Sequence, residues 1–289
     1  QGSSDAELAN VQLQYVRETY GYPHMVGHRS NLAGEMYNGC KDESANITFH
    51  FSHSVQKVHS WSPGVRFEVK PRDGEAFDVE CDVLLAADGV KSNIRDQMLA
   101  LLNIDAKVVD SGQAAYRIML DRKDMENDPE LLELIDGERA TRWIGERRHI
   151  IAYPVSNNTI YNLSTAQPDT NFAAAPSATY TTKGSKKEML ETYADFCPKV
   201  QKMLNMVPEG EVCEWKLRVH APLPTWVHGS MALVGDACHP TLPHLAQGAA
   251  QAIEDGAVLG VVLSKVPDTS AESINKALKV YQELRKSRA

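Results

Sequence analysis

The hydrophobic pattern of the chain changes its period several times, which is typical of a mixed α/β architecture. Apolar residues at helical spacing predict helices over residues 5–19, 30–40, 92–101, 186–206 and 245–263. Alternating or continuous apolar runs between turn signals predict strands over residues 47–61, 65–70, 76–87, 114–120, 140–144, 149–155, 159–165, 212–220 and 231–234. The order of these segments favours a parallel sheet interrupted by a second sheet.

Two of the predicted strands end at a sharp turn that contains an aspartate. The strand 76–87 closes with a continuous apolar run, which is typical of a strand buried on both faces, and Asp88 follows it. The apolar strand 231–234 breaks just before Asp236. Ligands of open α/β sheets bind at the carboxyl ends of the strands, so both carboxylates are well placed to accept hydrogen bonds from sugar or ribityl hydroxyls.

The predicted helix 245–263 carries little side-chain bulk on its early turns, where the sequence reads LAQGAAQA. The first N–H groups of a helix have no partner inside it, and the helix dipole makes that end attractive to negative charge. We therefore expect this surface to admit a flat, partly anionic ligand close to the backbone.

The pattern of hydrophobic and polar residues changes near residue 107 and again after residue 222. Between these points strands alternate with loose segments and one amphipathic helix, whereas the buried strand type returns beyond them. We predict that one α/β domain, made of residues 1–106 and 223–289, is interrupted by a mixed sheet with helices over residues 107–222.

Composition and charge narrow the classes of partner. The chain has 289 residues, 43% of them hydrophobic and 24% charged, and a net charge of −8. This acidic balance argues against nucleic acid or an anionic membrane as a partner. No apolar run approaches the roughly 18 residues of a membrane span. The five cysteines include no CxxC pair, which favours reduced thiols and a cytoplasmic location.

Five stretches of sequence carry a resemblance to a known family. They are HRSNL at 28–32, AADGVKSNIR at 86–95, YRI at 116–118, RHIIAYPV at 148–155, and the whole segment 231–260. In this order they resemble the FAD-dependent aromatic hydroxylases (class A flavoprotein monooxygenases), particularly the fungal salicylate-hydroxylase-like branch. The resemblance implies a Rossmann-like FAD-binding domain in two parts, 1–106 and 223–289, around a substrate-binding domain.

The resemblance also implies which residues hold FAD. They are Arg29, Asp88, Gly89, Asp236, Pro243, Gly248 and Ala249. Arg29 is similar to the arginine that reaches the ribityl and phosphate region, and Asp236 to the carboxylate that holds the ribityl chain. Pro243 would border the flavin ring, and Gly248 with Ala249 would present N–H groups to the ring edge that becomes negative on reduction.

The implied reaction is hydroxylation of a small phenolic or other aromatic acid with O2, with NADPH or NADH as the source of hydride. Arg117 resembles the arginine that the fungal branch places over the substrate, where a guanidinium stabilises a phenolate. Tyr153 resembles its hydroxyl-bearing companion. His149 shares a strand face with Tyr153 by the period of two, so it is a further candidate for substrate binding.

The chain departs from the family pattern in one respect. No two of its 18 glycines are separated by a single residue, so the G-x-G-x-x-G fingerprint and the first βαβ unit are missing. We therefore expect a chain truncated at both ends. Two alternatives stay open, a non-catalytic remnant or binding protein without stable FAD and a flavin reductase of the same fold.

A metal-dependent hydrolase is the most distant alternative. Its candidate ligands are His220, His228, His239, His244 and Cys238. Their spacings match no standard ligand pattern, so we predict no metal site.

Overall fold

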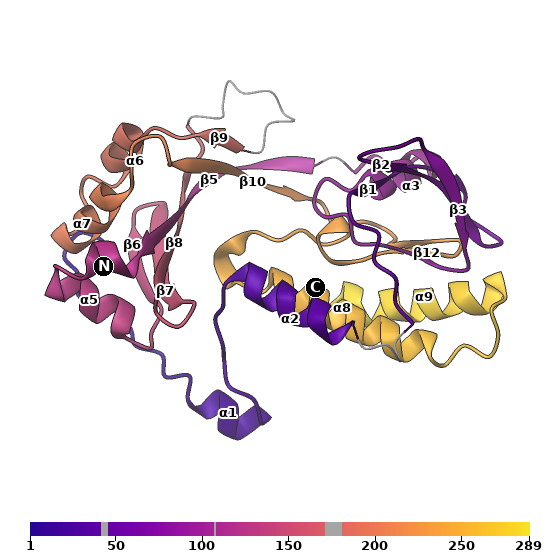
Figure 1. Cartoon of the computed structure of the whole chain (residues 1–289), viewed down its shortest axis with the longest axis horizontal. Helices are drawn as coiled ribbons and strands as arrows, with labels where there is room; N and C mark the ends of the chain where they lie inside the picture. Colours follow the sequence, from indigo (N-terminus) through magenta and orange to yellow (C-terminus); the bar gives the residue numbers. More distant parts are fainter. Residues whose placement is uncertain (42–45, 107, 171–180) are drawn as a thin grey trace. The chain divides into compact units, whose positions relative to one another are not determined.

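The structure is a computed structural model that describes residues 1–41, 46–106, 108–170 and 181–289. The chain forms two compact units (Figure 1). Unit 1 consists of Gln1–Ile47 and Gly112–Leu217, and unit 2 of Thr48–Ser111 and Arg218–Ala289. The predicted division at residues 106 and 222 stays a prediction, because residue 107 lies outside the described residues.

Unit 1 is built on a six-stranded sheet with the order β6-β7-β8-β5-β10-β9. The strands are β5 (Val108–Asp121), β6 (Thr141–Gly145), β7 (Arg148–Val155), β8 (Ile160–Pro168), β9 (Thr181–Lys183) and β10 (Cys213–His220). The pairs β6–β7, β7–β8, β8–β5 and β10–β9 are antiparallel. An antiparallel sheet can bury one face and leave the other accessible, and this sheet does so.

The helices of unit 1 are α1 (Tyr15–Tyr20), α2 (Arg29–Gly39), α4 (Arg122–Met125), α5 (Pro129–Asp136), α6 (Lys186–Thr192) and α7 (Pro198–Met206). Buried side chains of α4, α5, α6 and α7 form one core with the strands, and Figure 1 shows α5, α6 and α7 gathered beside β6, β7 and β8. Helix α5 begins after Asp128, whose side chain accepts hydrogen bonds from two N–H groups of the first turn. The helices therefore cover one face of the sheet.

Unit 2 contains two three-stranded sheets. The first is the antiparallel sheet of β1 (His53–Ser60), β2 (Val65–Pro71) and β3 (Phe77–Cys81). The second has the order β11-β12-β4, with β11 (Val227–His228), β12 (Met231–Leu233) and β4 (Leu84–Ala86). Three long helices complete the unit, α3 (Asn93–Leu101), α8 (Gly248–Leu263) and α9 (Ala271–Lys286), of which α8 and α9 lie side by side (Figure 1).

Several predicted elements are wrong in their extent. The helix predicted over 5–19 shrinks to α1, because none of its residues is buried and a short helix without packing is marginal. The strand predicted over 76–87 is two strands in different sheets, β3 and β4. The helix predicted over 186–206 divides into α6 and α7, since Pro198 cannot continue a helix but can start one.

The expectation that the second half of strand 76–87 is buried on both faces is also wrong. Leu85 in the middle of β4 is 41% exposed, because β4 is the edge strand of its sheet among the described residues. The expectation of a buried apolar strand at 231 is confirmed, since Met231, Ala232 and Leu233 are all fully buried. Burial therefore differs between two strands of similar apolar sequence according to their place in the sheet.

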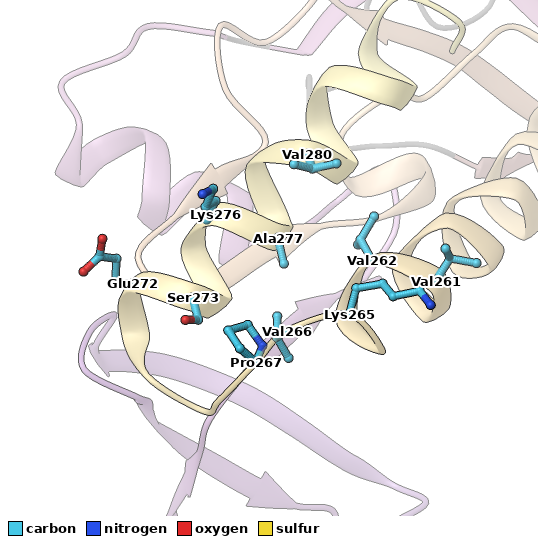
Figure 2. Close-up of a pocket in the computed structure, with 10 residues that line it drawn as sticks. All are labelled: Val261, Val262, Lys265, Val266, Pro267, Glu272, Ser273, Lys276, Ala277 and Val280. Atoms are coloured by element: carbon cyan, nitrogen blue, oxygen red, sulfur yellow. The ribbon is translucent and has the colours of Figure 1, made fainter.

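A groove of about 480 Å³ lies between the end of α8 and the start of α9. Figure 2 shows the residues that line it, among them the apolar Val262, Val266 and Ala277 and the cationic Lys265 and Lys276. None of the residues predicted to bind FAD lines it. Within the part of the chain that the structure describes, no helix has both the length and the apolar character to cross a membrane.

Candidate functional site

The two aspartate-containing turns that the sequence predicts lie at the same edge of one sheet in unit 2. Strands β4 and β12 pair in parallel, with Ala86 opposite Leu233, and the N–H of Val234 donates a 2.9 Å hydrogen bond to the carbonyl of Ala86. The chain segments that follow both strands therefore begin beside each other. In this way Asp88 and Asp236, far apart in sequence, both follow carboxyl ends of adjacent parallel strands.

Asp88 lies at the start of α3 and is partly occupied there. Its carboxylate accepts hydrogen bonds from the Ser92 hydroxyl at 2.5 Å and from the Ile94 N–H at 3.2 Å. Gly89 turns the chain with φ of +82°, a conformation that favours glycine. Because an ionised carboxylate offers about four lone-pair sites, Asp88 can stabilise the helix start and still accept a ligand donor.

Asp236 has a different environment. It lies in the 3₁₀ turn η2 (Gly235–Ala237), whose other two residues are buried, whereas Asp236 itself is exposed. Its carboxylate makes no hydrogen bond or ion pair with any residue that the structure describes. An exposed, unpaired carboxylate on a buried turn fits the task of accepting hydrogen bonds from the hydroxyls of a bound polyol chain.

The segment from Pro243 to Ala249 presents an uncapped helix start. The 3₁₀ turn η3 (Pro243–Leu245) ends at Ala246, which has φ of +52°, and α8 begins two residues later. Its N-cap residue Gln247 makes no side-chain capping hydrogen bond. The first N–H groups of α8, including those of Gly248 and Ala249, are thus available to a ligand, and the helix dipole favours negative charge there.

A buried polar cluster beneath the Asp236 turn is the part of the site that sequence reasoning missed. The Asp255 carboxylate, fully buried in α8, accepts hydrogen bonds from the Gly235 N–H, His239 Nε2 and Arg285 Nε. Burial opposes ionisation of Asp255, but these donors outweigh it and hold the pKa of the carboxyl below its usual value. The signal in the sequence was a pair of adjacent acids, Glu254 and Asp255, followed by an apolar helical run, GAVLGVVL.

The same cluster offers three possible metal ligands. Donor atoms of Cys238, His239 and Asp255 lie within 4.8 Å of one another. However, burial raises the pKa of the Cys238 thiol, so it keeps its proton, and a zinc ligand must be a thiolate. The Arg285 guanidinium is 2.8 Å from Asp255 and would repel a cation. The chemistry of the cluster therefore suits an internal ion-pair network better than a metal.

The three residues predicted to contact the substrate, Arg117, Tyr153 and His149, lie on one face of the sheet in unit 1. Side chains alternate between the two faces of a strand. The residues that flank the three candidates along β5 and β7 are buried in the helix-covered core, namely Tyr116, Ile118, Ile150 and Ala152. The candidates therefore lie on the face opposite to the core that α4, α5, α6 and α7 form with the strands.

The register of the sheet gives the spacing between Arg117 and Tyr153. Arg117 of β5 lies opposite Ser164 of β8, and Tyr153 of β7 lies opposite Asn162 of the same strand. Arg117 and Tyr153 are thus separated by one intervening strand, or about 10 Å across the sheet, and by two residues along it. The Arg117 guanidinium lies 5.8 Å from the ring centroid of Trp215, an arrangement that limits where the cation can point.

Arg29 lies in unit 1, whereas the other residues predicted to bind the cofactor lie in unit 2. It is the first residue of α2 and is exposed, and the preceding residue, His28, is the N-cap. The helix predicted over residues 30–40 thus begins one residue earlier, and the ring nitrogen Nδ1 of His28 is 2.7 Å from the Ser30 hydroxyl.

Comparison with known proteins finds FAD-dependent monooxygenases and aromatic hydroxylases among the relatives of this chain. FAD-dependent monooxygenase ntnJ of Nectria sp. is 38% identical over 210 residues, which cover 73% of this chain and 48% of the relative. The 3-hydroxybenzoate 6-hydroxylase of Polaromonas naphthalenivorans strain CJ2 is 29% identical over 94% of this chain and 62% of its own. A solved salicylate hydroxylase substrate complex matches with a TM-score of 0.74 at 26% identity, over 91% of this chain and 62% of that chain.

These matches confirm the predicted mixed α/β fold of the flavoprotein hydroxylases. The chain spans about half the length of the first curated relatives that it matches. A family model described as FAD binding domain matches residues 11–289. The chain therefore belongs to the FAD binding domain family, and its relatives are FAD-dependent monooxygenases.

Proposed function

We propose that the protein is an FAD-dependent monooxygenase that hydroxylates a small phenolic or other aromatic acid with NAD(P)H and O2. The observation that carries this proposal is the parallel pairing of β4 with β12, which brings the turns of Asp88 and Asp236 to one sheet edge. When bound, FAD would take hydride from the nicotinamide and activate O2. With this chemistry, one oxygen atom would enter the aromatic ring and the other would leave as water.

Unit 2 would supply the cofactor contacts. The exposed Asp236 carboxylate would accept hydrogen bonds from ribityl hydroxyls, and Pro243 would border the ring. The N–H groups of Gly248 and Ala249 would stabilise negative charge on the reduced ring, because they are uncapped and lie at the positive end of α8. Asp88 and Gly89 would contact FAD and the incoming nicotinamide.

Unit 1 would supply the substrate contacts. A guanidinium favours the phenolate form of the substrate, and a phenolate is a more electron-rich ring for oxygen insertion. Arg117 would stabilise this phenolate, Tyr153 would donate or accept one hydrogen bond, and His149 would line the same sheet face. Arg29 would contribute a fixed positive charge for the flavin phosphates.

Two measurements on the purified protein test the proposal. Titration with FAD, followed by flavin fluorescence and visible absorbance, tests cofactor binding. Oxygen uptake and NAD(P)H oxidation by the FAD-loaded protein, with and without a panel of phenolic acids, test the reaction. We expect both rates to rise with an aromatic acid and a hydroxylated product to form.

Each alternative gives a different result in the same measurements. A flavin reductase would oxidise NAD(P)H at a rate that no aromatic acid changes and would form no hydroxylated product. A non-catalytic binding protein would leave the flavin spectrum unchanged during the titration. Either result would replace the monooxygenase by that alternative.

A further inference from the structure

We infer that Asp255 is a positioning residue: its buried carboxylate holds the turn Gly235–Ala237 against α8 and thereby sets the direction in which the Asp236 side chain leaves the turn. The inference rests on the proposed function only for the identity of the ligand at Asp236. The contacts that carry it lie within unit 2 and involve no cofactor.

Asp255 is connected to the turn through one of its carboxylate oxygens. Oδ2 of Asp255 accepts the Gly235 N–H at 2.9 Å and His239 Nε2 at 2.6 Å, so one oxygen atom binds the residue just before Asp236 and the residue three positions after it. The N–H groups of Cys238 and His239 both donate to the Gly235 carbonyl, at 2.9 and 3.0 Å. The carboxylate and the carbonyl together fasten both ends of the turn.

The Asp255 carboxylate is itself held in place by Arg285. Its other oxygen, Oδ1, accepts Nε of Arg285 at 2.8 Å, and Arg285 is only 2% exposed. The two terminal nitrogens of the same guanidinium donate to Glu254 and to the backbone carbonyl and side chain of Gln251, both in α8. Asp255 is therefore held from α9, and a buried charge with saturated partners has a single orientation.

The turn Gly235–Ala237 lies close to α8. Gly235 has φ of +61°, and a Cβ atom added to it would lie 3.2 Å from Cβ of Ala252, so the backbone sits directly on α8. From the other side, Nη1 of the buried Arg95 donates to the Ala237 carbonyl at 3.4 Å. Asp236, between these two fixed residues, is the exposed member of the turn. Its direction thus depends on the contacts of its neighbours.

A comparison with Glu254 distinguishes the positioning role of Asp255 from a general contribution to the stability of the fold. Glu254 is the sequence neighbour of Asp255 and binds the same guanidinium of Arg285, together with Arg288. Among the residues that the structure describes, the side chain of Glu254 is bound only by Arg285 and Arg288, and neither belongs to the turn. Loss of Glu254 removes its ion pairs with Arg285 and Arg288, whereas loss of Asp255 removes the ion pair with Arg285 and the attachment of the turn. The chain thus offers a matched control at the adjacent position.

The test compares Asp255→Asn with Glu254→Gln, each an isosteric loss of charge. Without flavin, amide hydrogen exchange at Gly235 should become about tenfold faster in Asp255→Asn, since its N–H loses a charge-assisted acceptor, and should stay unchanged in Glu254→Gln. With flavin, Asp255→Asn should weaken FAD binding about tenfold, and Glu254→Gln by less than about twofold.

A double-mutant cycle with Asp236→Ala tests whether Asp255 acts through Asp236. If it does, Asp255→Asn should weaken FAD binding much less in the Asp236→Ala background than in the wild type, because residues that act as a unit are not additive. An equal loss in both backgrounds, or unchanged Gly235 exchange, would overturn the inference. If Asp255→Asn does not fold, Arg285→Lys loosens the same carboxylate, and the same cycle and outcomes apply to it.

The two arms separate this inference from the proposed function. A wild-type protein that binds no FAD would contradict the proposed function, and the exchange rate of the Gly235 amide would then decide the inference by itself. A wild-type protein that binds FAD with an Asp255→Asn variant of equal affinity would contradict the inference and leave the proposed function intact.

Discussion

The sheet of unit 1 and the parallel strand pair of unit 2 carry their candidate residues in opposite ways. In unit 1 the candidates are side chains that project from the middle of regular strands, and alternation along β5 and β7, together with their pairing with β8, puts Arg117 and Tyr153 on one face. In unit 2 the candidates lie in turns after short strands, and a buried network with Asp255 at its centre gives the turn its shape. In unit 1 a regular strand backbone determines where the candidate side chains lie, whereas in unit 2 the geometry of irregular turns determines it.

This difference predicts how substitutions act. A strand of a packed sheet keeps its backbone when one exposed side chain changes, so a substitution on the open face of unit 1 should alter chemistry and leave stability unchanged. A turn held by buried hydrogen bonds depends on several residues at once, so a substitution of a buried residue that holds the Asp236 turn should alter binding and stability together.

The largest expected effect is on the reaction of the Arg117→Met variant. Methionine keeps much of the length of the side chain but removes the positive charge and all five donors. One preorganised electrostatic contact is worth about 3 kcal/mol, so aromatic-dependent NAD(P)H oxidation by the FAD-loaded protein should fall about a hundredfold. The flavin spectrum should be unchanged, since Arg117 is not among the residues predicted to hold FAD.

Arg142→Met is the matched control for Arg117→Met. Arg142 pairs with Ile151, which in turn lies opposite Ser164, so it is on the same face and in the same row of the sheet as Arg117. It stands three strands away, or about 14 Å. Equal losses in the two variants would mean that net charge, and not a contact with substrate, determines turnover.

The next largest effect is expected for FAD binding in the Asp236→Ala variant. A charge-assisted hydrogen bond to a hydroxyl is worth about 1.5–3 kcal/mol, so the dissociation constant for FAD should rise about ten- to a hundredfold. Thermal unfolding should be unchanged, because Asp236 has no partner among the described residues. Asp82→Ala, which removes another exposed carboxylate of unit 2, should leave FAD binding at its wild-type level.

The success of sequence reasoning differed between the two regions for a physical reason. Alternation in β7 follows from the period of two and correctly put His149 and Tyr153 on one face, away from buried Ile150. The turns after β4 and β12 were also predicted, because an apolar run that stops at an aspartate is a local signal. Their position at one sheet edge was not predicted, since the pairing of β4 with β12 joins segments that are far apart in the chain.

The network of Asp255 could not be predicted from the sequence. Its three donors come from positions 20, 16 and 30 residues away in the chain, and no spacing rule connects them. The exposure of Leu85 was missed for the same reason, because an edge strand and a central strand can have equally apolar sequences. Local patterns thus predicted elements and faces, and the contacts between distant segments required the structure.

A smaller effect is expected for the stability of the Gly235→Ala variant. A left-handed backbone costs a non-glycine residue about 1–2 kcal/mol, and the new methyl group would press on Ala252. Chemical denaturation should show a loss of this size, with weaker FAD binding. Gly256→Ala is the control, because Gly256 lies inside α8 with open space at its Cβ, and alanine there should stabilise the helix by up to about 1 kcal/mol. A stable Gly235→Ala protein would show that the turn can sit elsewhere.

The smallest effect is expected for Tyr153→Phe, and it sharpens the comparison within unit 1. The change removes one hydroxyl and leaves the ring, so the loss is that of one neutral hydrogen bond, about 0.5–1.5 kcal/mol or about two- to tenfold in kcat/KM for the aromatic acid. Tyr161→Phe makes the same chemical change on the buried face of the same sheet, where the side chain belongs to the core. If only the open face binds substrate, Tyr161→Phe should alter stability and leave kcat/KM unchanged. A loss of kcat/KM in Tyr161→Phe that equals the loss in Tyr153→Phe would show that sheet packing, and not a contact from the open face, explains both.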